Sequence, residues 1–506
     1  MDQVLPVPED EATDQVKAPQ SGMDEVLPVP EDEAADQMKG PRKGHPILAW
    51  IAIIGLVVFL YVRQTHLSHE RASSNNDQTD ALTMQLQARY LVGAAQFTSK
   101  SAFEPQILSM NTGPVRRRLR AIILVGQISG PAKAEELLKD LDFQLAEQEI
   151  ETSAKDKSLK ETLKRLYADY SQGRFDAPSL QPYEREVLHG DLSWFGDLAL
   201  APEGGDEEAR AKVLQPALLT AVGVPCLIVS GLLAALAGLF GLVFLIIFFY
   251  SGQVRGGLDC GLAYGGLYAE TFAIWLVLFP LLSLAAGFVP AGKSQLLVQG
   301  LAMLAGLSVL AWPVLRGVPW RQVRQDIGLT RGRWPRMEPF FGVGGYAMTL
   351  PLLGVTVIIM AAIMAARGGP LGAHPQNNFG PIDQPSHPVI DYLARGNWWT
   401  WVQVMVVACI LAPIVEETMF RGVLYRNLRE MTNRRGFTFS FLVSGLLASF
   451  IFAVIHPQGL IFVPLLMSLA LGFSILREWR GSLIAPMIAH AIQNGLVTTI
   501  VFLSAS

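Results

Sequence analysis

Charged residues are scarce in this sequence. Only 17% of its 506 residues are Asp, Glu, Lys or Arg, whereas an ordinary soluble domain has roughly 25%. The net charge of −4 is small, so nothing favours nucleic acid as a partner. Hydrophobic residues make up 51% of the chain, and the mean hydropathy is positive, at +0.33. This composition is typical of a protein that lies largely within a lipid bilayer.

Cysteine is also rare, and two familiar site motifs are missing. The three cysteines, Cys226, Cys260 and Cys409, form no CxxC pair, so the sequence contains no disulfide framework and no evidence of the redox compartment. They lie in or next to apolar runs, and we expect them to be small buried hydrophobic residues. The sequence has no HExxH motif, which excludes a zincin-type protease. It also has no glycine-rich loop followed by lysine, so nothing in it predicts nucleotide binding.

The first 44 residues are a tandem repeat. Residues 1–22 match residues 23–44 at 16 of 22 positions. The repeat is acidic, contains proline and has no aromatic residue. It has too little apolar surface to offset its ordering entropy, so we predict a disordered tail over residues 1–44. The tail either binds a partner or is a duplicated extension without function.

One apolar run follows the tail, and a polar region follows that run. Residues 45–63 contain a 17-residue apolar stretch between basic residues, which resembles a signal anchor and is near the lower length limit for a membrane span. Residues 64–213 are polar, and leucines recur there at helical spacing. We expect a small soluble, mainly helical region without site chemistry. Its histidines, His66, His69 and His189, are interpreted as solvated.

The rest of the chain, residues 214–506, predicts a multi-pass membrane domain. Eight apolar runs there are each long enough to cross a hydrocarbon core of roughly 30 Å. Only helices can satisfy the backbone within one segment in lipid. We therefore predict an all-α polytopic transmembrane bundle of about eight core helices plus one N-terminal anchor helix. The runs lie at about residues 217–250, 262–290, 295–315, 339–366, 398–420, 437–456, 459–476 and 482–504.

Arginines gather in alternate short loops of this domain. The positive-inside rule then predicts an orientation in the cell membrane. The N-terminal tail lies in the cytoplasm, and residues 64–213 lie on the outer side. The arginine-bearing loops contain residues 316–336, 421–435 and 477–480.

The last 110 residues contain ionisable groups, which are costly inside a bilayer and therefore indicate function. In the segment EETMFR, Glu417 and Arg421 are four residues apart and can pair on one helix face. Glu416 projects about 100° away from Glu417 and is available for another role. The alternative is a helix-end ion pair at the membrane surface.

Two histidines in apolar surroundings complete the set. Phe452 precedes His456 by four residues, and His490 precedes Asn494 by four on a shared helix face. Taken alone, His456 is an interfacial residue, and His490 with Asn494 makes an interhelical hydrogen bond. The spacing contains a conflict about depth in the membrane. His490 lies about 13 Å along its helix from the turn at Gly481. If the helix over residues 459–476 is straight, His456 lies nearer the opposite membrane face than His490 does.

Together the three patterns resemble the CAAX prenyl endopeptidase and bacteriocin-processing (CPBP) family, also called type II CAAX proteases or Abi-like proteins. The family's signatures are EExxxR, FxxxH and HxxxN/D on separate membrane helices, in this order. The resemblance covers about residues 260–506, and the motifs lie in 411–506. It implies an intramembrane endopeptidase with a membrane-associated or C-terminal-tail peptide as substrate.

The resemblance also implies roles for the residues. Glu416 and His456 would activate a water, and His490 with Asn494 would stabilise the oxyanion. Glu417, Arg421 and Phe452 would support them. Glu416, His456 and His490 are also a plausible zinc set, so the cofactor is none or one zinc ion. Asn494 is a good oxyanion donor and a poor zinc ligand, which favours the metal-free form.

Several alternatives stay open at this point. The expected partners are a peptide or protein, with or without a lipid, and the bilayer itself. The rival function is a non-catalytic membrane scaffold or bacteriocin-immunity-type protein of the same fold; a transporter is a third option, although few polar residues line the other helices. The 368–397 loop, with His374 and His387, is interpreted as an ordinary outer loop or a lid. Substrate identity and oligomeric state are open.

Overall fold

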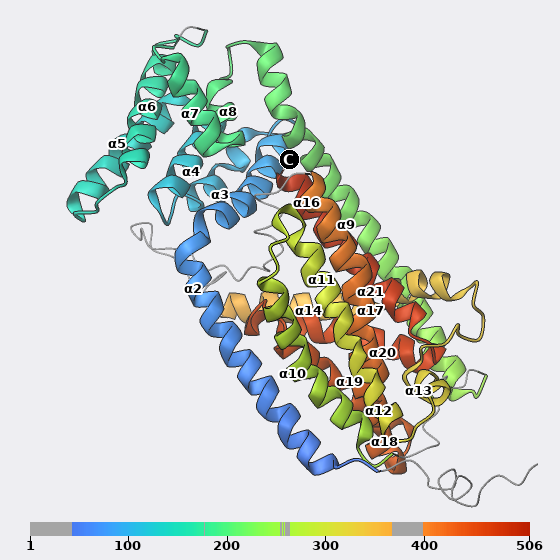
Figure 1. The fold of residues 1–506 in the computed structure, drawn as a ribbon. Helices are drawn as coiled ribbons and strands as arrows, with labels where there is room; N and C mark the ends of the chain where they lie inside the picture. Colours follow the sequence, from blue (N-terminus) through green and yellow to red (C-terminus); the bar gives the residue numbers. More distant parts are fainter. Residues whose placement is uncertain are drawn as a thin grey trace, which may run out of the picture. The chain divides into compact units, whose positions relative to one another are not determined.

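A computed structural model describes residues 43–176, 178–253, 256, 258, 264–366 and 398–505, without the side chains of residues 67–79, 364, 504 and 505. Residues 1–42 of the predicted 1–44 tail, the 368–397 loop and Cys260 lie outside the described residues. Residues 43–505 belong to one unit of the chain, and all that follows concerns this unit (Figure 1).

The all-α prediction is confirmed. The described residues form helices and turns, with no strand among them. Nine segments in this part of the chain are long and apolar enough to cross a membrane, which confirms the expected multi-pass bundle. The spans are Pro46–His66, Glu207–Tyr250, Leu267–Gly287, Gly292–Leu315, Glu338–Ile363, Trp398–Arg435, Phe437–Val454, Leu460–Arg480 and Ile484–Leu503.

The anchor segment is the first part of a much longer helix. Helix α2 (Pro46–Ala94) continues well beyond the apolar run and into the polar region. A proline at its first turn suits a helix start, because that position needs no backbone N–H donor. Its first half packs against α10 (Leu267–Gly287), with Ile53 fully buried between them.

The polar region forms a helical cluster with a core of its own. Leucines three and four residues apart on each helix face one another, as their spacing predicts; examples are Leu138 and Leu141 on α5, and Leu159 and Leu163 on α6. Ser153 caps α6 by accepting a hydrogen bond from the backbone N–H of Asp156 at 3.1 Å. The helices are α3 (Glu104–Ser109), α4 (Val115–Ile128), α5 (Pro131–Glu147), α6 (Ala154–Ser171), α7 (Pro182–Leu192) and α8 (Trp194–Leu200).

Helix α9 (Glu207–Tyr250) leads from this cluster into the membrane bundle. The side chain of Asp206 caps its start through the backbone N–H groups of the first turn. Most of its apolar side chains are exposed, as expected of side chains that face lipid. Cys226 is among the exposed residues and Cys409 is half-buried. The expectation of a buried Cys226 is therefore wrong, because this side of α9 has no protein neighbour.

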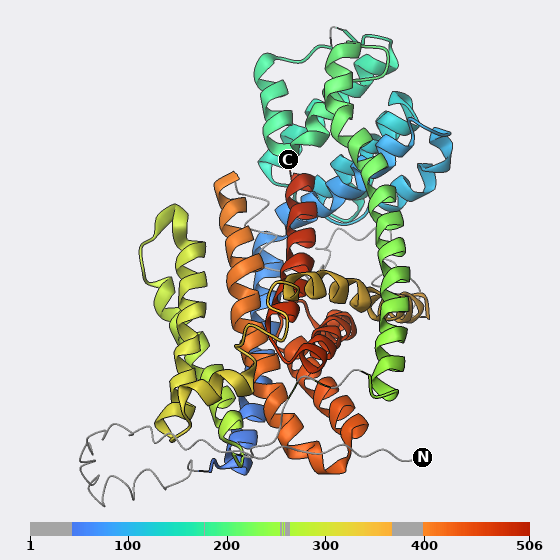
Figure 2. The same ribbon diagram turned by 90° about the vertical axis from the view of Figure 1, so that its right-hand side faces the viewer.

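The remaining helices pack around the last third of the chain. Helix α14 (Glu338–Ala366) contacts α9, α20 and α21, and Figure 2 shows it crossing between them. Helices α19 and α20 pack along each other. The span Trp398–Arg435 is one long helix interrupted by two π-helical segments. Bounds are α11 (Gln295–Ala305), α12 (Ala311–Leu315), α13 (Trp320–Ile327), α16 (Trp398–Val406), α17 (Ala412–Glu416), α18 (Tyr425–Thr432), α19 (Phe437–Val454), α20 (Val463–Arg480) and α21 (Ile484–Ala505).

The arginine-rich loops meet at one end of the bundle. Arg429 pairs with Glu478 at 3.0 Å, and Arg480 pairs with Glu338 at 2.7 Å. These side chains are almost fully buried, so each charge needs its partner. Their convergence agrees with the expectation that these loops share one side of the membrane; which side that is stays a prediction.

Candidate active site

The helix that contains Glu416 is locally widened on both sides of this residue. Val407–Leu411 and Glu417–Leu424 are π-helical, and the short α-helical turn Ala412–Glu416 lies between them. Pro413 has no N–H to donate to the carbonyl of Cys409, which weakens the α-helical ladder at this point. Such π-segments are often found at functional sites. The apolar run in the sequence predicted an ordinary helix here, and Pro413 is the residue that could have indicated the departure from α-helical geometry.

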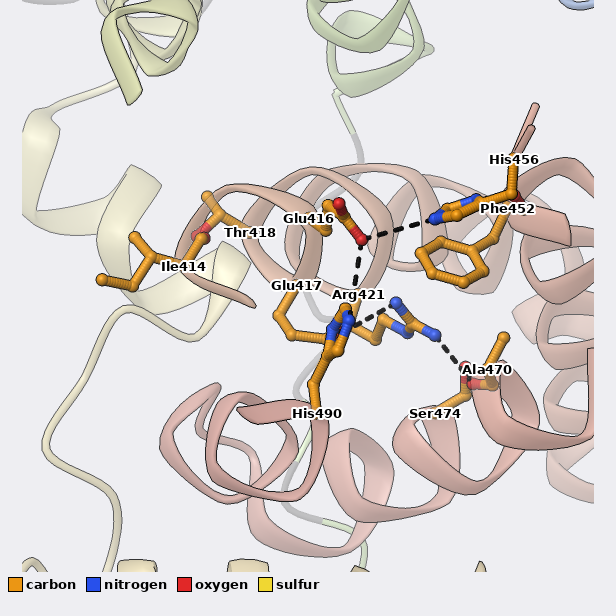
Figure 3. Close-up of polar contacts among 10 residues, drawn as sticks. All are labelled: Ile414, Glu416, Glu417, Thr418, Arg421, Phe452, His456, Ala470, Ser474 and His490. Carbon is orange, nitrogen blue, oxygen red and sulfur yellow. Dashed lines mark hydrogen bonds and ion pairs between the residues drawn. The ribbon is translucent and has the colours of Figure 1, made fainter. Parts of the chain in front are cut away.

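Glu416 and the two histidines converge, although Glu416 lies on α17, His456 in the turn after α19, and His490 on α21. The Glu416 Oε2 atom lies 3.7 Å from the His456 Nε2 atom and 3.8 Å from the His490 Nε2 atom (Figure 3). Both distances exceed a direct hydrogen bond. Within the described residues, Glu416 Oε2 is a buried oxygen with no hydrogen-bond partner. The space between these three atoms therefore suits a small molecule with O–H donors, such as water.

The other ring nitrogens of the two histidines are held by acceptors. His456 Nδ1 lies 2.5 Å from the carbonyl oxygen of Phe452, and His490 Nδ1 lies 2.8 Å from Glu417 Oε1. A carbonyl or carboxylate oxygen only accepts, so each Nδ1 carries a hydrogen. In a neutral histidine this leaves the lone pair on Nε2. Both lone pairs then face Glu416, ready to accept from a molecule placed between them.

The second glutamate of the pair lies deeper and supports the site. Arg421 Nη1 donates to Glu417 Oε1 at 2.9 Å, and the two side chains are 1% and 0% exposed. The pair is therefore enclosed by protein and is not an exposed ion pair at the end of a helix. Arg421 Nη2 also donates to the Ala470 carbonyl at 3.1 Å. The expected Glu417–Arg421 pair forms, and in addition it orients His490, which the sequence did not indicate.

Aromatic rings pack around these polar groups. The Phe452 ring lies 4.0 Å from the His456 ring and 5.0 Å from the Phe420 ring, centroid to centroid. The Phe473 ring stacks on His490 at 5.3 Å. The Arg421 guanidinium lies over both Phe452 and Phe473, where the faces of the rings attract its charge. Phe473 is a site residue that no sequence motif indicated.

Asn494 is held beside the first π-segment. Its Nδ2 atom donates to the carbonyl of Ala408 at 2.8 Å, which lies in that segment. No hydrogen bond joins Asn494 to Glu416, His456 or His490 in the part of the chain that is described. One N–H of the amide is thus used to fix its position, and the second stays available to a ligand.

Helix α2 also reaches the site, although it precedes the motifs by hundreds of residues. The side-chain amide of Gln64 donates to the carbonyl of Ile455, the residue next to His456. Helix α19 ends at Val454, so the Ile455 carbonyl has no later helical turn to supply a donor. Gln64 supplies it instead. The sequence contained no signal for this contact, because α2 resembles a simple anchor.

The predicted zinc set of Glu416, His456 and His490 stays a prediction. Among the described residues, no group of three or more His, Cys, Asp and Glu side chains is placed to hold a metal ion. His456 and His490 both lie against Glu416. The difference in depth that straight helices would create between the two histidines therefore does not occur.

Comparisons with known proteins agree with the motif-based resemblance. A family model described as "Type II CAAX prenyl endopeptidase Rce1-like" matches residues 397–496. The "Membrane-embedded CAAX protease MroQ" of Staphylococcus aureus (strain USA300) is 31% identical over 88 residues, which cover 17% of this chain and 35% of the relative. The chain thus spans about a third of the length of this curated relative. No solved structure matches.

Proposed function

We propose that the protein is an intramembrane endopeptidase, because residues 397–496 match the type II CAAX prenyl endopeptidase family model and resemble a membrane-embedded CAAX protease. One observation above all supports the proposal. A buried carboxylate oxygen of Glu416 has no hydrogen-bond partner among the described residues and faces two histidine nitrogens at 3.7 and 3.8 Å. A purely structural carboxylate in such surroundings would be expected to have a partner.

In the proposed reaction, Glu416 is the general base. A water between Glu416 and His456 gives its proton to the Glu416 carboxylate, and its oxygen attacks the carbonyl carbon of the scissile peptide bond. His456 Nε2 accepts the water's second hydrogen and thereby orients the attacking lone pair. When the tetrahedral intermediate collapses, protonated Glu416 returns the proton to the leaving amine nitrogen.

The proposed role of His490 and Asn494 is to stabilise the oxyanion of the tetrahedral intermediate. His490 can donate from Nε2 when its ring is protonated, and Glu417 at 2.8 Å from Nδ1 stabilises that cation. The second N–H of Asn494 is the other donor. Glu417 and Arg421 would thus act by positioning His490, and Phe452 by packing against His456.

The substrate and the orientation are finer proposals. We propose a membrane-associated or C-terminal-tail peptide, with or without a lipid, since a site within membrane helices receives its substrate from the bilayer or its edge. The arginine-rich end is placed in the cytoplasm of the cell by the positive-inside rule. Residues 64–213 then lie on the outer side.

The test is peptide cleavage by purified, detergent-solubilised protein. Wild type is compared with Glu416→Gln on quenched peptides, prenylated and plain, with and without a zinc chelator. Glu208→Gln makes the same chemical change at an exposed position and serves as the control. We expect Glu416→Gln to lose at least about a hundredfold in kcat while the control retains full activity. Chelator sensitivity of the wild type would indicate a metal. Equal rates for the folded wild type and Glu416→Gln would contradict the proposal and favour the non-catalytic scaffold.

A further inference from the structure

The connection between two membrane spans carries exposed positive charge that no other part of the described chain compensates. It comprises residues 318–337, between the spans Gly292–Leu315 and Glu338–Ile363, and is called the basic connection below. Five of its arginines are exposed, and none of them forms an ion pair or a side-chain hydrogen bond within the described chain. They are Arg321, Arg324, Arg331, Arg333 and Arg336.

The carboxylates of this stretch face the protein interior. Asp326, on α13, is 6% exposed and accepts from the Tyr268 hydroxyl at 2.7 Å. Glu338, where the next span begins, is fully buried and pairs with Arg480 at 2.7 Å. Both negative charges are therefore engaged inside the bundle, and the outer surface of the basic connection presents positive charge alone.

Large aromatic side chains are exposed among these arginines. Trp320 comes directly before Arg321 and is 45% exposed, and Trp334 comes directly after Arg333 and is 59% exposed. Phe340, in the first turn of the next span, is 67% exposed. Tryptophan is enriched where membrane helices meet water, because one part of its ring is apolar and its N–H is polar. The basic connection thus has the composition of a surface at the headgroup level of a bilayer.

The inner side of the basic connection is fixed to the bundle. Val323 and Ile327 are fully buried on α13, which packs on the π-segment Glu417–Leu424. The backbone N–H of Leu483 donates to the Gly328 carbonyl at 3.0 Å. Because its inner side is held, the connection presents its outer arginines in defined places, which lowers the entropy cost of binding a ligand there.

A second basic turn has the same character. Figure 1 shows α13 and α18 at the same end of the bundle, and α18 leads into the turn Asn433–Arg435. Arg434 and Arg435 are exposed there, and the Arg435 guanidinium lies 5.5 Å from the ring centre of Phe439, which is also exposed. Exposed arginine beside exposed aromatic side chains therefore occurs twice at this end.

We propose that the outer surface of the basic connection binds the headgroups of anionic phospholipids in the leaflet around this end of the bundle. Guanidinium groups bind phosphate oxygens through paired N–H donors, and a cluster of this size next to a membrane helix is attracted to anionic lipid. The rings of Trp320 and Trp334 lie at the boundary between headgroups and acyl chains. These exposed rings beside the span ends favour a bilayer over a soluble acidic peptide as the partner. The proposal does not depend on the endopeptidase activity.

The test is ligand binding by the full chain, measured by native mass spectrometry from detergent micelles. Dimyristoyl phosphatidylglycerol, dimyristoyl phosphatidylcholine and a soluble decaglutamate peptide are titrated separately. The double variant Arg331→Gln with Arg333→Gln removes two exposed charges of the basic connection. The matched control is Lys157→Gln with Arg185→Gln, at exposed positions of the polar region that also lack ion pairs within the described chain. Melting temperatures verify that both double variants are folded.

We expect phosphatidylglycerol to bind more tightly than phosphatidylcholine. Its affinity should fall roughly tenfold or more in the Arg331 and Arg333 double variant and stay unchanged in the control. Arg321→Gln with Arg324→Gln, on α13, should have a similar effect. Equal affinity for the two lipids, or a loss no larger in the arginine variants than in the control, would overturn the proposal. Decaglutamate binding as tight as that of phosphatidylglycerol, and lost in the same variants, would also overturn it and assign the surface to an acidic peptide.

Discussion

At the scale of single residues, the site depends on how each side chain is held by the next. Glu417 is the clearest example, because one of its oxygens accepts from both Arg421 and His490, at 2.9 and 2.8 Å. A buried carboxylate with a buried arginine is stable only as a pair. The second partner explains why the pair lies against His490 rather than elsewhere in the bundle.

The first prediction concerns this link. Glu417→Gln keeps the shape of the side chain but removes the charge that stabilises protonated His490. We expect kcat to fall about 10- to 100-fold, the range found when outer partners of ligating histidines are lost, with little change in KM. Steady-state kinetics on a quenched peptide measure both constants.

A structural role alone would give a different result for Glu417→Gln. Separate measurements of kcat and of the melting temperature distinguish the two, because loss of the Glu417 charge should lower kcat per folded molecule even where the variant is as stable as wild type. An unchanged kcat with a lower melting temperature would mean that Glu417 acts only through stability.

A second prediction at this scale concerns pH and the polar region. Hydrogen bonds from the Ser179 hydroxyl and N–H, both at 2.6 Å, hold the pKa of Asp169 below its usual value, and Arg174 at 2.8 Å adds to this. The folded-state pKa is thus lower than the unfolded one. Its stabilisation is complete above the unfolded value of about 3.9 and is lost as pH falls through the folded value.

Hydrogen exchange of the α6 amides at pH 6 and at pH 3 measures this effect. Wild type should lose protection in α6 at the lower pH by more than Asp169→Asn does, because the variant has no carboxylate to protonate. An equal loss in both proteins would show that other carboxylates control acid stability here.

At the scale of elements, α2 is more than an anchor. Its first half packs on α10, its side chain at Gln64 reaches the turn before His456, and its second half enters the core of the polar region. One helix thus contacts the candidate site and the core of the polar region. Its role in the site depends on a single hydrogen bond, which makes the contact testable.

Gln64→Leu should lower kcat without unfolding the protein. The variant leaves the Ile455 carbonyl without its donor and frees the turn that positions His456. We expect a roughly 3- to 10-fold loss in kcat, with KM almost unchanged. Gln96→Leu, the same chemical change, is the matched control, since the Gln96 side-chain amide donates to the carbonyl of Val92 four residues earlier in the chain. Equal rates for Gln64→Leu and wild type would remove Gln64 from the site.

At the scale of the whole described unit, close helix approaches set the packing of the membrane bundle. Gly238 on α9 lies against α14 so closely that an added methyl carbon would sit 1.9 Å from the Ala347 carbonyl oxygen. Small residues at such positions let backbones approach in lipid, where van der Waals packing stabilises helix pairs. Most large apolar side chains of α9 are exposed, so this close backbone contact with α14 helps to fix how α9 joins the bundle.

Gly238→Ala should therefore weaken the α9–α14 contact by about 1–3 kcal/mol, because the backbone atom it meets cannot move aside alone. Gly231→Ala, on the same helix with open space around it, is the control and should be neutral or slightly stabilising. Denaturation in mixed micelles measures both. Equal stability of the two variants would show that α9 can shift without cost.

The sequence by itself determined the class of the molecule and the identity of its chemistry. Apolar runs long enough to cross a bilayer leave the backbone no choice but helix, so the all-α bundle and its nine spans in the described residues could be predicted. The three motifs indicated the family for the same kind of reason: Glu416, His456 and His490 are ionisable residues in segments where such groups are costly.

Tertiary structure decided how those residues meet. Two π-segments, with Pro413 between them, flank Glu416 on its helix. Glu417 accepts a hydrogen bond from His490 on another helix, and Gln64 donates to the turn before His456. These contacts join residues tens to hundreds of positions apart, and no local periodicity encodes them. Local sequence sets each helix and its faces, whereas helix packing determines which faces meet.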